Sequence, residues 1–202
     1  MNRAVFLDRD GVINAAIWNP VEGKPDTPYS LEDFRLLPGV AQAVRTISQM
    51  GFLAVVVSNQ PGVAKGKCGR ELLAAVNQRM LDSMAEEGAR LDGVYYCLHH
   101  PDAVIPSLRV HCPCRKPRPG LLVQAAKDLE IDLSRSYMIG DQQADIEAGL
   151  AARCKTVLLD GHSLSDAGPN GSRVRAHWIA RDLSGAVRAI RRAEGGGPWR
   201  SS

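Results

Sequence analysis

The stretch Val5-Phe6-Leu7-Asp8-Arg9-Asp10-Gly11-Val12 decides how this chain folds. The apolar run from Ala4 to Leu7 predicts a short buried strand. The run is followed by two aspartates that are separated by one residue. Their carboxylates repel each other unless a cation lies between them or one is protonated. Ligands of open α/β sheets bind at the carboxyl ends of strands, so Asp8 and Asp10 form a candidate active site. The alternative is that both are turn and capping residues.

The composition is that of an ordinary globular protein. Of the 202 residues, 45% are hydrophobic and 23% charged, enough for one domain with a sizeable core. The net charge of +3 is small and the basic residues are dispersed, which argues against nucleic-acid and membrane partners. No apolar run reaches the roughly 20 residues of a membrane span, and no secretory signal pattern is present. We therefore expect a cytoplasmic protein. We also expect it to act on a small molecule and to be a monomer, although the composition itself does not set the oligomeric state.

Strand-like apolar runs alternate with helical patterns along the chain. The predicted strands cover 4–7, 52–58, 93–96, 137–139, 156–159 and a weaker run at 177–179. The predicted helices cover 40–49, 70–87, 120–129, 144–152 and 183–192. This alternation predicts an α/β fold, a three-layer Rossmann-like sandwich with a mostly parallel sheet. We expect one domain over 1–193 without a separate cap domain, and a disordered glycine-rich tail over 194–202.

Polar groups follow the later strands at the points where those strands end. Ser58-Asn59-Gln60 offers a hydroxyl and two amides, and Arg115-Lys116 precedes a helix start, where anions are attracted. Asp141 follows another strand, and Asp145 lies one helical turn later. Each group alone also fits a polar loop, two surface cations or a helix cap. At one edge of a parallel sheet, together they provide what magnesium and a substrate phosphate require.

Two long segments interrupt the alternation. Residues 14–33, which we call the flap, contain three prolines directly after the two acids, and we expect them to cover the site. The segment 97–119 holds three of the five cysteines. Its thiols and an imidazole form two closely spaced pairs that can close a tetrahedral zinc site: Cys97, His99, Cys112 and Cys114. Buried cysteines without a metal are the alternative, and His100 and His111 are rival ligands.

The ordered motifs resemble those of the haloacid dehalogenase superfamily of phosphatases, over about residues 4–159. They are Asp8-Arg9-Asp10-Gly11-Val12, Ser58-Asn59-Gln60, Lys116, and Gly140-Asp141 with Asp145. Three longer runs look like the D-glycero-D-manno-heptose 1,7-bisphosphate phosphatases, a group with a zinc loop that works in lipopolysaccharide precursor biosynthesis. These runs are 6–14, 58–66 and 114–120. The longer flap, and Gln142 where those relatives often carry lysine, are departures from the resemblance.

The resemblance implies a magnesium-dependent phosphatase with defined catalytic residues. Asp8 would attack phosphorus and form an aspartyl-phosphate, while Asp10 would protonate the leaving oxygen and then activate water. Ser58 and Lys116 would hold the phosphate oxygens. The implied substrate contacts are Asn14, Asn59, Gln60 and Arg115. The implied magnesium ligands are Asp8, the Asp10 carbonyl and Asp141, supported by Asp145, and the implied ligands of a structural zinc are Cys97, His99, Cys112 and Cys114.

Two other functions remain open from the sequence. Histidinol-phosphate phosphatases share the acids and the zinc loop, although the runs 62–66 and 116–120 fit the heptose enzymes better. A zinc-ribbon-like binding module without catalysis would need a basic stripe with aromatic residues near the cysteines. The chain offers few candidates for such a stripe: Tyr95, Tyr96, Arg109 and Arg115.

Overall fold

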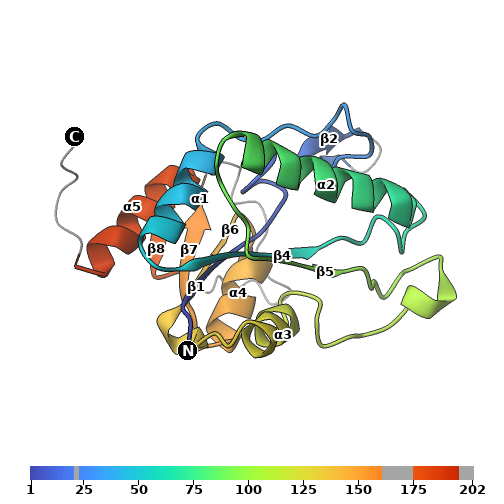
Figure 1. Cartoon of the computed structure of the whole chain (residues 1–202). Helices are drawn as coiled ribbons and strands as arrows, with labels where there is room; N and C mark the ends of the chain where they lie inside the picture. Colours follow the sequence, from blue (N-terminus) through green and yellow to red (C-terminus); the bar gives the residue numbers. More distant parts are fainter. Residues whose placement is uncertain (21–22, 161–174, 196–202) are drawn as a thin grey trace.

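A six-stranded parallel sheet forms the centre of the computed structural model, which describes residues 1–20, 23–160 and 175–195 (Figure 1). The strand order is β5-β4-β1-β6-β7-β8, and every neighbouring pair is parallel. The strands are β1 (Ala4–Leu7), β4 (Leu53–Asn59), β5 (Gly93–Cys97), β6 (Tyr137–Gly140), β7 (Lys155–Leu159) and β8 (Trp178–Ala180).

Helices cover both faces of the sheet, so the predicted three-layer α/β sandwich is confirmed. One face carries α1 (Val40–Gln49), α2 (Arg70–Glu86) and α5 (Leu183–Ala193). The other carries α3 (Gly120–Asp128) and α4 (Gln143–Ala151). Strand β1 serves both layers, because Val5 and Leu7 belong to the first core and Ala4 and Phe6 to the second. A strand buried on both faces reads as a continuous apolar run rather than an alternating one.

The order in which the chain adds strands to the sheet reverses at β1. Strands β4 and β5 extend the sheet on one side of β1, and β6, β7 and β8 extend it on the other. Such a switch point leaves a crevice at the carboxyl ends of the two adjoining strands, here β1 and β6. The residues that follow β1, β4 and β6 therefore meet at one edge.

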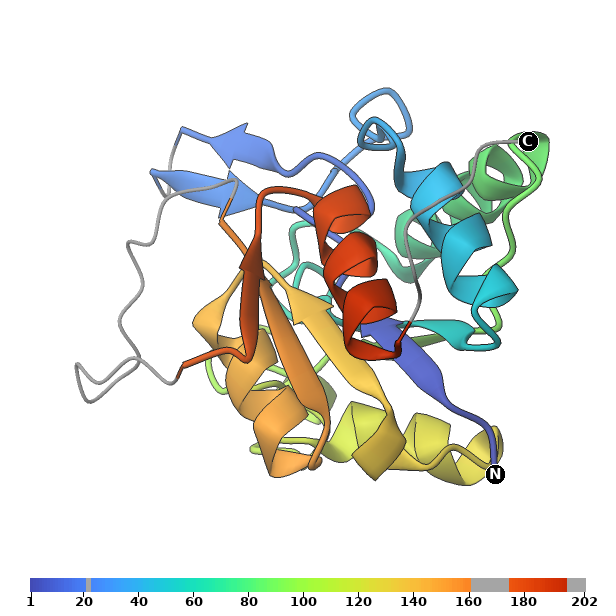
Figure 2. The same ribbon diagram turned by 90° about the vertical axis from the view of Figure 1, so that its left-hand side faces the viewer.

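All predicted strands and helices are present, with ends within one residue of the predicted bounds. The flap differs from expectation, because it contains a small antiparallel hairpin of β2 (Ile17–Asn19) and β3 (Lys24–Asp26) (Figure 2). Two 3-10 turns, Pro106–Leu108 and Leu133–Arg135, were also not predicted. Three-residue strands, one of them with a central proline, leave no alternating pattern to detect.

Most of the predicted tail, 196–202, lies outside the described residues. Its first residue, Glu194, is held in place, because its carboxylate pairs with Arg3 Nη1 at 2.6 Å and accepts a hydrogen bond from Tyr137 Oη at 2.6 Å. Among the helices that the structure describes, none has the length and apolar character needed to span a bilayer.

Adjacent residues on α3 provide a test of the second core. Leu122 is fully buried, whereas Val123 is 51% exposed. Leu122→Ala should lower the free energy of unfolding by about 2–5 kcal/mol, because it leaves a cavity in a packed layer. Val123→Ala, the matched control, should change it by less than about 0.5 kcal/mol. Equal effects of the two substitutions in urea unfolding would contradict this packing.

Candidate active site and metal centres

The carboxyl ends of the central strands bring four charged side chains into one cluster. Lys116 Nζ lies 2.9 Å from Asp8 Oδ1 and 2.5 Å from Asp145 Oδ1. It also donates a hydrogen bond to the Val57 carbonyl at 2.9 Å. One carboxylate oxygen from each of Asp8, Asp141 and Asp145 lies within 4.8 Å of the others. Residues taken from three separate motifs therefore face one another.

Two glycines allow the carboxylates to approach this closely. Gly11 has a φ of +85°, and a Cβ at that position would lie 2.2 Å from Asp141 Oδ2. A Cβ on Gly140 would lie 2.2 Å from the Cβ of Asp145. A larger residue at either position would displace the neighbouring carboxylate. Glycine is therefore required at both positions for steric reasons, because only a residue without a Cβ leaves room for the neighbouring aspartate.

The cluster has more buried negative charge than its lysine neutralises. Burial, together with the charges of Asp8 and Asp145, raises the pKa of Asp141 to about 8. Burial also raises the pKa of Asp145, to about 6. Asp141 Oδ1 is buried and accepts no hydrogen bond from any described residue. Carboxylate oxygens are the ligands that Mg²⁺ takes in proteins, so these residues fit a magnesium ion.

The Asp10 carboxylate is held from behind by three side chains. Gln60 Nε2 donates to Oδ2 at 2.7 Å, Asn14 Nδ2 donates to Oδ1 at 2.9 Å, and Arg9 Nη2 lies 3.1 Å from both oxygens. The resemblance predicts that Asn14 and Gln60 contact substrate. In the structure they are 0% and 2% exposed, and the amide nitrogen of each donates to Asp10. In this structure they orient Asp10 rather than line the cavity.

Asn59 and Arg115, two further predicted substrate contacts, form hydrogen bonds with backbone groups beside the cluster. Asn59 bonds to both backbone groups of Lys116, because its Nδ2 donates to the carbonyl and its Oδ1 accepts from the N–H, each at 3.0 Å. This pairing fixes where the Lys116 side chain starts. Arg115 Nη1 donates to the His99 carbonyl at 3.3 Å, and Arg115 also lines the cavity described next.

A cavity of about 1330 Å³ opens over the cluster. Asp8, Asp10 and Ser58 line it beside Lys116, and the flap contributes Trp18 among other residues. The cavity wall also carries basic side chains: Lys65, Lys67, His100, Arg115 and Arg175. These surroundings suit an anionic ligand that extends beyond the carboxylate cluster.

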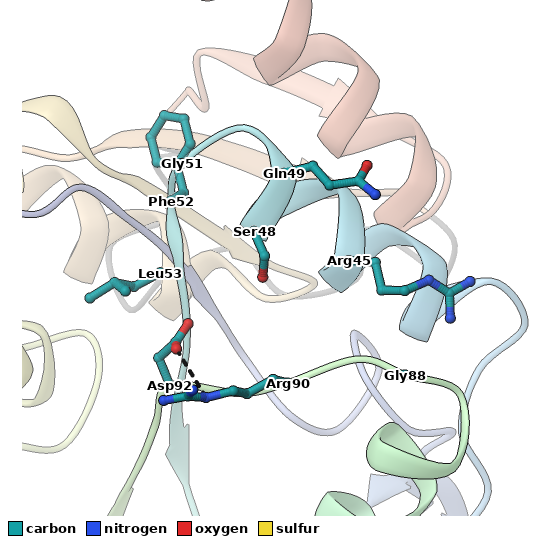
Figure 3. A pocket seen from close by; sticks show the side chains of 9 residues that line it. All are labelled: Arg45, Ser48, Gln49, Gly51, Phe52, Leu53, Gly88, Arg90 and Asp92. Carbon is teal, nitrogen blue, oxygen red and sulfur yellow. Dashed lines mark ion pairs between the residues drawn. The ribbon is translucent and has the colours of Figure 1, made fainter. Parts of the chain in front are cut away.

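A second hollow lies at the amino-terminal ends of β4 and β5 (Figure 3). Its one carboxylate, Asp92, pairs with Arg90 at 3.5 Å, and Arg45 donates to the Glu87 carbonyl. It brings no set of carboxylates together, so the chemistry belongs to the first cavity.

Sequence reasoning misses two residues of the site. Arg9 is 1% exposed, although the sequence motif gives a role only to the two acids on either side of it. Thr27 lies in the flap and bonds to both Arg9 and Gln60. The one available sign for Arg9 is a cation directly beside two aspartates at the end of a buried strand, and no sequence pattern marks Thr27.

The predicted zinc ligands form a second cluster. Ligand atoms of Cys97, His99, Cys112 and Cys114 lie within 4.8 Å of one another, and the sulfur–sulfur distances run from 3.1 to 3.5 Å. These cysteines form no disulfides. A tetrahedral zinc site has Zn–S bonds of about 2.3 Å, which places sulfurs roughly 3.8 Å apart, so the set fits after a small expansion. The rival ligands His100 and His111 are not members of this cluster.

Comparisons with known proteins agree with this fold. Residues 113–186 match a protein-family model described as HAD-hydrolase-like. A Yersinia pestis D-glycero-beta-D-manno-heptose-1,7-bisphosphate 7-phosphatase is 37% identical over 93% of this chain and 95% of its own length. A crystal structure of a HAD-like phosphatase from Mesorhizobium loti has a TM-score of 0.77 and 37% identity, and covers 99% of this chain and 90% of its own.

A further solved structure carries ligands. It is the D,D-heptose 1.7-bisphosphate phosphatase from B. bronchiseptica complexed with magnesium and phosphate, with a TM-score of 0.75, 26% identity, and coverage of 95% of this chain and 99% of that one. Fold, site and relatives together define a phosphoric monoester hydrolase. The chain belongs to the haloacid dehalogenase family of phosphatases.

Removing one buried charge tests the electrostatics of the cluster. The pKa of Asp141 is about 8 in the folded protein, against about 3.9 when unfolded, so the folded state binds more protons between these values. Stability of the metal-free protein should therefore fall as pH rises from about 4 to about 8. Asp141→Asn should remove this loss and raise the free energy of unfolding at pH 8 by more than about 1 kcal/mol.

Urea unfolding in a chelator at pH 5 and pH 8 measures this change. Glu86→Gln, which removes an exposed charge on α2, is the control and should change stability by less than about 0.5 kcal/mol. Added magnesium should stabilise the parent protein and not the Asp141 variant. If the variant at pH 8 is no more stable than the parent, the description of the cluster is wrong.

Proposed function

We propose that this phosphatase removes the 7-phosphate of D-glycero-D-manno-heptose 1,7-bisphosphate, with Asp8 as nucleophile. The observation that carries the proposal is the 37% identity, over 93% of the chain, to a Yersinia pestis enzyme named for that reaction. The cavity supports it, because its basic side chains lie on the same opening as the carboxylate cluster and suit a second phosphate on the substrate. The cysteines of the cluster form no disulfides, which suits the reducing cytoplasm, and we propose that the protein acts there. We also propose that it acts as a monomer.

The chemistry follows from the positions of the charged groups. Asp8 attacks phosphorus, and Lys116, held by Asp8 and Asp145, offers positive charge to the phosphoryl oxygens together with the hydroxyl of Ser58. Asp10 gives a proton to the leaving sugar oxygen and then takes one from the water that hydrolyses the aspartyl-phosphate. Bound magnesium, held by Asp8, the Asp10 carbonyl and Asp141, would neutralise phosphate charge so that a carboxylate can approach.

We propose further that Cys97, His99, Cys112 and Cys114 hold a structural zinc. Burial raises the pKa of the Cys97 thiol, and a bound cation is what keeps such thiols deprotonated. The metal would fix the loop whose His99 carbonyl accepts from Arg115. Zinc would therefore act on the substrate pocket indirectly, by positioning one of its cations.

A panel of phosphate esters tests the proposed substrate. With magnesium, kcat/KM for heptose 1,7-bisphosphate should exceed that for histidinol phosphate by at least about tenfold, since only the bisphosphate can use the additional cations. Asp8→Asn should reduce turnover of every ester by more than about a thousandfold without loss of the folded circular dichroism spectrum. Faster turnover of histidinol phosphate would overturn the substrate, and near-normal activity of the Asp8 variant would overturn the nucleophile.

Removing one thiol tests the zinc centre. Cys112→Ser should release bound zinc and lower kcat/KM by about tenfold or more, because the loop that carries Arg115 loses its anchor. Cys154→Ser, a buried cysteine outside the cluster, should keep its zinc. Elemental analysis of both purified variants and of the parent gives the result. A parent protein purified without zinc would exclude this centre.

A further inference from the structure

The network behind Asp10 extends into the flap. Thr27 follows β3 directly and is 8% exposed. Its hydroxyl accepts a hydrogen bond from Arg9 Nη2 and donates one to Gln60 Oε1 at 3.2 Å. Arg9 Nη2 also donates to Gln60 Oε1 at 2.9 Å. A flap residue is thus linked by two routes to the carboxylate that handles the proton.

The Gln60 amide connects Asp10 to the flap. Its Nε2 donates to Asp10 Oδ2 at 2.7 Å, which leaves Oε1 on the opposite side. Oε1 then needs donors, and Arg9 and the Thr27 hydroxyl supply them. Without the hydroxyl, Gln60 loses one of the contacts that favour this orientation of its amide. Buried networks of this kind act as a unit, because each bond orients the next.

A neighbouring ion pair holds Thr27 in place. Lys67, in the loop after β4, lies 2.8 Å from Asp26 Oδ2, one residue before Thr27. Asp26 Oδ1 in turn accepts from the Thr27 backbone N–H at 2.9 Å. Burial alone would raise the pKa of Asp26, but its hydrogen bonds with Lys67 and Tyr29 lower it overall. The flap is therefore seated on the loop that also carries Gln60.

We propose that Thr27 is a positioning residue for Asp10 and acts through Gln60 and Arg9. This inference rests on the proposed role of Asp10. When Asp8 forms its bond to phosphorus, the bond from phosphorus to the sugar oxygen breaks and Asp10 gives that oxygen its proton. Water then attacks the aspartyl-phosphate, its proton passes to Asp10, and Asp8 and inorganic phosphate are released. Both transfers need the Asp10 carboxyl group aimed at the reacting oxygen, and the Thr27 hydroxyl keeps it there.

Paired substitutions separate the hydroxyl from the shape of the side chain. Thr27→Val keeps the volume and loses the hydroxyl, and it should lower kcat for heptose 1,7-bisphosphate by about tenfold or more with KM within about twofold. Thr27→Ser keeps the hydroxyl and should restore kcat to within about threefold of the parent. Thr46→Val removes a hydroxyl from the surface of α1 as a control, and should leave kcat unchanged.

A double-mutant cycle with Asp10→Asn tests the route of the effect. If Thr27 acts through Asp10, Thr27→Val should have no further effect on kcat once Asp10 has been replaced. The same loss in both backgrounds, or a rise in KM in place of a fall in kcat, would show that the hydroxyl serves the substrate or the flap itself, and would overturn the inference. Thr27→Val with normal kcat, beside an inactive Asp10→Asn, would also overturn it while the proposed function stands. An Asp10→Asn variant as active as the parent would instead refute the proposed role of Asp10.

Discussion

The ion pairs of Lys116 with Asp8 and Asp145, at 2.9 and 2.5 Å, are the interaction on which the rest of the site depends. Burial alone would lower the pKa of Lys116, but the two carboxylates raise it above its ordinary value, so the lysine stays charged. One lysine cannot neutralise three carboxylates, and Asp141 is left with a raised pKa. The cluster therefore carries an excess of buried negative charge, which a bound divalent cation would neutralise.

Two loops enclose this cluster, and polar contacts hold them. The flap is held by Lys67 and by the bonds of Thr27. The cysteine loop, residues 97–119, brings its four candidate metal ligands within 4.8 Å of one another. A third, small apolar core lies between the loop after β4 and the cysteine loop, and its buried members are Val63, Ala64, Ala103 and Leu108. This arrangement gives the described part of the chain an open cavity that is lined largely by loops at one edge of the sheet.

The sequence carried enough information for the fold and for the charged cluster, because both follow from local patterns. Buried parallel strands are short apolar runs, and Asp8, Ser58 and Asp141 each stand where such a run ends. The roles of Asn14 and Gln60 could not be obtained in the same way. An amide fits substrate and protein equally well, and only the three-dimensional path shows that both turn inward toward Asp10. Thr27 lies beyond a three-residue strand that contains proline, so no periodicity marks it.

A crystal structure of the protein with magnesium and inorganic phosphate would test the central claim most directly. The account predicts one magnesium ion about 2.1 Å from oxygens of both Asp8 and Asp141, with phosphate between Asp8, Ser58 and Lys116. Magnesium bound away from these carboxylates, or phosphate at the opposite edge of the sheet, would contradict it.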